Sequence, residues 1–122
     1  MVNPIVAYVD RQTKKIEEQT EALIRTYMQM LSSSADARAV RDLAREGSAS
    51  AAEIADRALP IHTELFSQVM SNSRRDLVLR KKQRVQLIEQ FCVALWIKFV
   101  GREGFDLMRE RLGLVGQRGQ VG

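Results

Sequence analysis

The stretch from residue 74 to residue 100 constrains the fold of this chain most, because it begins basic and ends almost wholly apolar. Side chains suited to a core recur along it every three or four residues, which is the period of one helix face. This seam consists of Val78, Lys81, Val85, Ile88, Cys92, Leu95 and Phe99. The pattern predicts one long helix with an apolar end in a core and a basic end with another role.

Lys81 lies in line with the core positions of this seam. A buried lysine without an acidic partner is costly, whereas a lysine near the surface can extend its side chain to water. We therefore expect the core seam to stop near Val85 and the turns before it to meet solvent or a partner. If Ser73 caps the helix, Arg74 and Arg75 lie at the positive end of its dipole, which is unfavourable unless they face an anion.

A second long helix is predicted at the N-terminus. Asn3 can cap a helix and Pro4 suits its first position. Two adjacent stripes follow with a period of seven, one apolar and one mildly polar: Val9, Ile16, Leu23 and Met30, and Val6, Thr13, Thr20 and Tyr27. This amphipathic helix could pair with another protomer, but its threonines favour packing within a bundle.

Shorter helices are expected between these two. The serine run 32–34 ends the first helix and offers a cap to the next, which Gly47 closes. Ser50 and Glu53 have capping-box spacing for a third helix. Pro60 cannot donate a backbone hydrogen bond, so the chain kinks or restarts there.

Glycines mark the end of the domain. Gly101 and Gly104 are predicted to stop the long helix, and a short amphipathic element containing Phe105, Met108 and Leu112 is expected to dock back. We predict an all-α bundle of about five to six helices over residues 1–112, followed by a flexible, glycine-rich tail over residues 113–122.

Charge is distributed unevenly in a chain of 122 residues with a formal net charge of +4. Residues 1–60 contain eight Lys and Arg against nine Asp and Glu, whereas residues 61–122 contain eleven against six. A locally positive surface favours anionic partners. The N-terminus does not resemble a secretory signal, and no apolar run reaches the ~20 residues of a membrane span. We expect a cytoplasmic protein without a membrane span.

Catalytic and metal-binding patterns are not found in the sequence. His62 is the only histidine and Cys92 the only cysteine, so neither a zinc site nor a Cys–His nucleophile pair has enough members. We expect His62 to be a surface or capping residue and Cys92 a small core residue. The prediction is a protein that is not an enzyme and that has no cofactor, metal or small-molecule substrate.

The basic segment, residues 74–84, is the candidate binding surface. Its six cations spread around most of the helix circumference: Arg74, Arg75, Arg80, Lys81, Lys82 and Arg84. Such a spread suits contacts with the phosphates of a nucleic-acid backbone, although a solvated cationic face is an equal alternative. No aromatic residue lies between Phe66 and Phe91, so a base-stacking platform is not expected within the segment itself.

Trp96 and Phe99 are candidate interface residues in the apolar end of the same stretch. Aromatic side chains contribute strongly to protein interfaces. The alternative is that both belong to the core of a small domain.

A cysteine-poor helical domain of this size, with a basic segment and neither a catalytic set nor a stacking box, resembles the small helical subunits of CRISPR effector ribonucleoproteins. The resemblance implies a bundle whose copies stack within a larger complex. It also implies a basic surface along the path of guide RNA or of a displaced DNA strand.

The expected function is therefore a non-enzymatic subunit that contacts an RNA or DNA backbone without sequence specificity. Its expected partners also include other protein subunits, and self-association is a further option. The main alternative is a helical adaptor, chaperone or regulator that binds an acidic protein and no nucleic acid. A membrane-surface helix is less favoured, because no bulky exposed apolar face accompanies the basic one.

Overall fold

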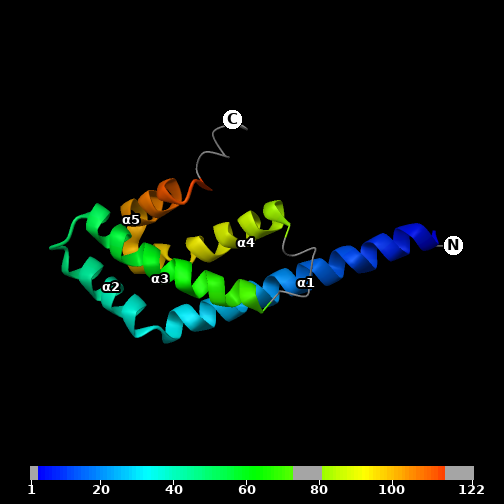
Figure 1. Ribbon diagram of the computed structural model, residues 1–122, viewed down its shortest axis with the longest axis horizontal. Coiled ribbons are helices and arrows are strands. Elements are labelled where there is room, and N and C mark those ends of the chain that lie inside the picture. Colours follow the sequence, from blue (N-terminus) through cyan, green and yellow to red (C-terminus); the bar gives the residue numbers. More distant parts are fainter. Residues whose placement is uncertain (1–2, 73–80, 115–122) are drawn as a thin grey trace.

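The computed structural model describes residues 3–72 and 81–114, and within these ranges the chain is all-α. The described helices are α1 (Pro4–Ser33), α2 (Ala35–Glu46), α3 (Ala51–Ser71), α4 (Lys82–Ala94) and α5 (Ile97–Arg111), as Figure 1 shows. The predicted helical bundle with a long N-terminal helix is confirmed.

Short polar residues define where the first three helices begin. The side chain of Asn3 accepts a hydrogen bond from the amide of the second residue of α1 at 2.9 Å, and Pro4 needs no acceptor. The hydroxyls of Ser34 and Ser50 each accept an amide three residues on at 3.1 Å. Gly47, with φ 76°, closes α2. These caps satisfy backbone groups that a helix end leaves free, and all were predicted.

Helix α3 lies at the centre of the bundle and contacts the other four described helices. Helix α5 packs against α2, α3 and α4, and α4 also packs against α1. The largest fully buried side chains come from α1, α3, α4, α5 and the turn before α5: Trp96, Tyr27, Leu31, Ile88, Met108, His62, Val69, Val93 and Cys92.

Helix α1 packs in the bundle over only part of its length. Its buried residues are Thr20, Tyr27 and Leu31, all in the second half. The first half extends away from the other helices (Figure 1, blue), and Ile5 is 73% exposed. The predicted packing of the two α1 stripes within the bundle is therefore confirmed for the second half of the helix. It is wrong for the first half, where no other helix covers the stripes.

Pro60 neither ends α3 nor separates two helices, so of the two predicted alternatives, a kink or a restart, the restart is wrong. Proline leaves the carbonyl of Asp56, four residues earlier, without its helical partner. Both residues lie on the exposed face of α3, where water can satisfy that carbonyl. A buried proline would have been more disruptive.

The predicted single helix over residues 74–100 is wrong in its bounds. Helix α4 begins after Lys81, whose backbone is extended, and ends at Ala94. At Leu95 and Trp96 the amides bond carbonyls three residues back, at 3.2 and 2.9 Å, instead of four. This tighter turn separates α4 from α5 and places the Trp96 side chain in the core.

The two glycines predicted to stop the helix have different roles. Gly101 has φ 79° and ψ 174° and bends the start of α5, as expected of a break. Gly104 lies inside the helix, which corrects that part of the prediction. A Cβ at Gly104 would lie 3.0 Å from Val100 Cβ and 3.7 Å from Ile54 Cγ2. The missing side chain permits close packing of α5 against itself and α3.

The structure describes the first two residues of the predicted tail, Gly113 and Leu114. Leu114 is buried in the core. The remainder of the predicted tail, residues 115–122, and the predicted cap Ser73 lie outside the described residues.

Replacing Gly101 with alanine should lower the free energy of unfolding by about 1–3 kcal/mol, because φ 79° with ψ 174° is a region that only glycine adopts easily. A Cβ there meets no atom within 4 Å, so the loss is conformational and not steric. Urea denaturation measures it, with exposed Arg102→Ala as the control. A loss equal to that of the control would contradict this interpretation.

Candidate functional site

The described part of the predicted basic segment lies at the start of α4. Lys81 and Lys82 are exposed, and Arg84 is half-buried. The expectation that the core seam stops near Val85 is confirmed, since Val85 is only partly buried and Ile88 is the first fully buried residue of α4. Arg74, Arg75 and Arg80 lie outside the described residues.

The first turn of α4 concentrates positive charge. Lys81 occupies the N-cap position, no side chain caps the helix end, and the first turn contains no acidic residue. Free amides and the helix dipole make such an end positive. Within the described ranges, neither Lys81, Lys82 nor Arg84 forms an ion pair. The three cations and the positive helix end repel one another unless an anion is present. This site can therefore bind phosphate groups.

The predicted interface residues do not form an exposed patch. Trp96 is fully buried, which corrects its assignment as an interface residue and supports the alternative of a core position. Phe99 is half-buried, with its ring 5.6 Å from that of Trp96. The guanidinium of Arg41 lies over the Phe99 ring at 6.0 Å. Trp96 therefore cannot meet a partner while the domain is folded.

A chain of hydrogen bonds connects four side chains through the core. Trp96 Nε1 donates to the Tyr27 hydroxyl at 2.6 Å, and that hydroxyl lies 2.7 Å from His62 Nδ1. His62 Nε2 lies 2.9 Å from Glu89 Oε2. The chain joins α1, α3, α4 and the turn before α5.

The donors and acceptors of this chain fit one protonation pattern. An indole nitrogen can only donate, so the Tyr27 hydroxyl accepts from Trp96 and donates to His62 Nδ1. His62 then carries its proton on Nε2 and donates to the carboxylate of Glu89. Trp96 Nε1, the Tyr27 hydroxyl and both ring nitrogens of His62 are therefore all paired, which removes the cost of burying them.

His62 was predicted to be a surface or capping residue, and this prediction is wrong because His62 is fully buried. Its ring also stacks on that of Phe66, with centroids 5.6 Å apart. The sequence indicated only part of this buried hydrogen bonding: Tyr27 and Trp96 both lie in core patterns, and both need a hydrogen-bond partner when buried. Nothing local, however, connects residue 62 with residues 27 and 96. Of the four hydrogen-bonded side chains, only that of Glu89 reaches solvent, with 21% of it exposed. The hydrogen bonds therefore serve to hold the core together.

Cys92 is a buried core residue, as predicted. Burial raises the pKa of its thiol to about 12, and the negative charge of Glu89 acts in the same direction. Burial also raises the pKa of Tyr27. Both groups stay protonated at neutral pH, so Cys92 is a poor nucleophile.

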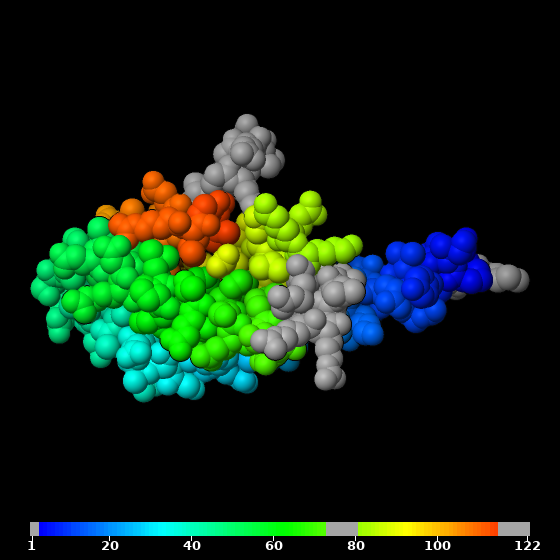
Figure 2. Space-filling model, in the orientation of Figure 1, coloured from blue at the N-terminus to red at the C-terminus, as the bar shows by residue number. Residues whose placement is uncertain are grey.

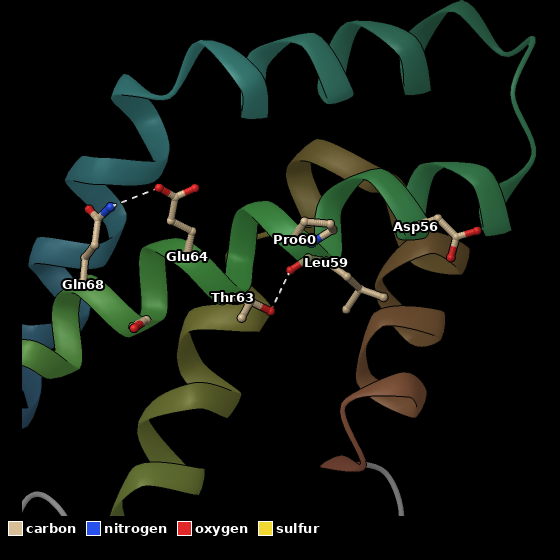
Figure 3. Close-up of a pocket in the computed structure, with 7 residues that line it drawn as sticks. Asp56, Leu59, Pro60, Thr63, Glu64 and Gln68 are labelled. Atoms are coloured by element: carbon tan, nitrogen blue, oxygen red, sulfur yellow. Dashed lines mark hydrogen bonds between the residues drawn. The ribbon is translucent and has the colours of Figure 1, made fainter.

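An open hollow of about 690 Å³ runs along one side of α3 (Figure 3). Only α3 lines it, with Asp56, Leu59, Pro60, Thr63, Glu64, Ser67 and Gln68. Most of its polar side chains already have partners: Thr63 donates to the Leu59 carbonyl, Gln68 donates to Glu64, and Asp56 pairs with Arg111. The hollow offers no convergent set of free groups for a ligand.

The parts of the chain that the structure describes contain neither a metal-binding cluster nor a membrane-spanning helix. No three His, Cys, Asp or Glu residues there are placed to hold a metal ion. None of the described helices is both long and apolar enough to cross a membrane. No protein-family model, curated protein or solved structure matches the chain. The uncapped start of α4, with its unpaired cations, is the best candidate for a binding site among the described surfaces.

Tyr27→Phe should destabilise the fold by about 2–4 kcal/mol, because it leaves both Trp96 Nε1 and His62 Nδ1 buried without a partner. Urea denaturation checks this value. Tyr8→Phe removes a hydroxyl from an exposed tyrosine of the same helix and should change the stability by less than about 0.5 kcal/mol. Equal effects of the two substitutions would show that the buried chain is energetically unimportant.

The raised pKa of Cys92 predicts a loss of stability in alkali. Above pH ~9 the unfolded chain releases the thiol proton that the folded chain keeps up to pH ~12. The contribution of the Cys92 thiol to the free energy of unfolding is therefore complete below pH 9, and it falls by about 1 kcal/mol per pH unit above pH 9.

Cys92→Ala should remove this part of the pH dependence, so the difference in unfolding free energy between the wild type and the variant should shrink between pH 8.5 and 10.5. Urea denaturation under reducing conditions measures it. A difference that stays constant over this range would contradict the prediction.

Proposed function

We propose that this protein is a non-enzymatic helical subunit that contacts a nucleic-acid backbone without sequence specificity inside a larger ribonucleoprotein complex. The observation that carries the proposal is the uncapped start of α4, where Lys81, Lys82 and Arg84 surround a helix end with no acidic residue. Phosphate groups would relieve the repulsion among these charges.

A polyanion fits this surface better than a single small anion. The side chains of Lys81 and Lys82 are exposed, and successive helix positions point in directions about 100° apart. They can therefore reach different phosphates of one strand but cannot converge closely on one. Contacts of this kind determine affinity and carry little information about base sequence.

The first half of α1 supports the assembly part of the proposal. Its exposed apolar residues are Ile5, Val6, Tyr8 and Val9. A contiguous apolar surface of this kind on a projecting helix suits burial against another protein subunit, including a second copy of the chain. This fits the resemblance to the small subunits of CRISPR effector complexes, which implies stacked copies.

The same α1 surface also favours the main alternative, a helical adaptor, chaperone or regulator that binds proteins only. In that case the cations of α4 would face an acidic protein. The two functions differ in whether a nucleic acid alone is bound in a salt-dependent manner.

Binding of a mixed-sequence oligonucleotide should weaken steeply as salt rises. Replacing Lys81, Lys82 and Arg84 with glutamine should reduce the slope of log Kd against log salt by about 2–3, since each phosphate contact contributes about one counterion. Fluorescence anisotropy across a salt series measures both quantities.

The matched control carries Arg11→Gln, Lys14→Gln and Lys15→Gln, which remove the same charge from an exposed part of α1. The control should keep the wild-type slope. If both triple variants lose binding equally, the effect is one of net charge and the α4 site is wrong. If the wild-type protein shows no binding even at low salt, the adaptor function is favoured.

A further inference from the structure

Helix α4 presents two exposed apolar side chains beside its cations. Phe91 is 51% exposed and Leu87 is 39% exposed. Neither side chain was among the candidate binding or interface residues predicted from the sequence. In Figure 2 the first turns of α4 (yellow-green) stand out from the surface.

These side chains share one face with two of the cations, Lys81 and Arg84. Arg84, Leu87 and Phe91 are three and seven residues apart, which aligns them along a helix over about 10 Å. Lys81 precedes them at the same spacing. The face therefore changes from cationic to aromatic along its length.

The only carboxylate of α4 points away from this face. Glu89 is bonded to the buried His62, on the side of the helix opposite Phe91. A negatively charged strand can follow this face from Lys81 to Phe91 without meeting an acidic residue of the same helix.

Resting on the proposed function, we propose that the ligand is a single-stranded nucleic acid, with its phosphates held on this face by Lys81 and Arg84 and one base stacked on the ring of Phe91. A duplex cannot use this ring in the same way, because its bases are already stacked on one another. Exposed aromatics next to cations are the usual means by which proteins bind single strands without reading sequence.

The chemistry is common to RNA and DNA, since every base has a stacking face. Gln83 and Gln90 are exposed on one flank of this face and could reach base edges or the ribose hydroxyl. Comparison of the two kinds of strand therefore identifies the source of the ligand.

The test measures Kd for a mixed-sequence single-stranded RNA, the corresponding single-stranded DNA and a DNA duplex of equal length. The wild-type protein should bind at least one single strand more tightly than the duplex. Phe91→Leu should weaken binding of that strand about 5- to 100-fold, because leucine keeps the apolar contact but cannot stack. Phe91→Trp should bind at least as tightly as the wild type.

Two measurements separate stacking from other effects. The salt slope of Phe91→Leu should equal that of the wild type, since its phosphate contacts are unchanged. Met28→Ala, which removes an exposed apolar side chain from another part of α1, should leave Kd unchanged.

If Phe91→Leu binds like the wild type while the glutamine variant of Lys81, Lys82 and Arg84 does not, the stacking proposal fails and the proposed function stands. Equal affinity of the wild-type protein for duplex and both single strands also overturns the stacking proposal. If neither variant changes binding, both proposals fail.

Discussion

The hydrogen-bonded chain from Trp96 through Tyr27 and His62 to Glu89 is the interaction on which the rest of the structure depends. It joins segments 69 residues apart in sequence, and it does so with directional contacts that an apolar core lacks. Because Glu89 must face His62, the rotation of α4 about its own axis is set. Phe91, on the opposite side of the helix, then has to face solvent. The core therefore determines which face of α4 is available to a partner.

Local patterns predicted much of this fold, and their failures share a physical cause. Helix starts at Asn3, Ser34 and Ser50 were correct because capping is a contact between residues two or three apart. The exposure of Lys81 followed from the cost of burying its charge. The sequence left a kink or a restart open at Pro60, because the effect of a proline depends on whether the freed carbonyl meets water, and that exposure is a tertiary property.

The same distinction explains what could not be predicted at the candidate site. An apolar run such as residues 91–100 does not reveal which side chain faces out, so Trp96 was a candidate for either an interface or the core, and the exposure of Phe91 was not predicted. The turn at Leu95 and Trp96 accompanies the burial of Trp96. This turn contains no glycine or proline that would predict it, and it brings Trp96 Nε1 within 2.6 Å of the Tyr27 hydroxyl. His62 was missed because its partners lie on other helices.

The start of α4 shows why a local conflict can indicate function. Placing arginines at the positive end of a helix dipole was already unfavourable at Arg74 and Arg75 in the sequence, where it suggested either a continuous helix or an anion. The structure starts α4 at Lys82, so the same conflict recurs at Lys81, Lys82 and Arg84 without a cap. Moving the helix boundary does not remove it. Stability alone does not explain such a charge pattern, whereas a bound phosphate backbone would turn each unfavourable charge into a favourable contact.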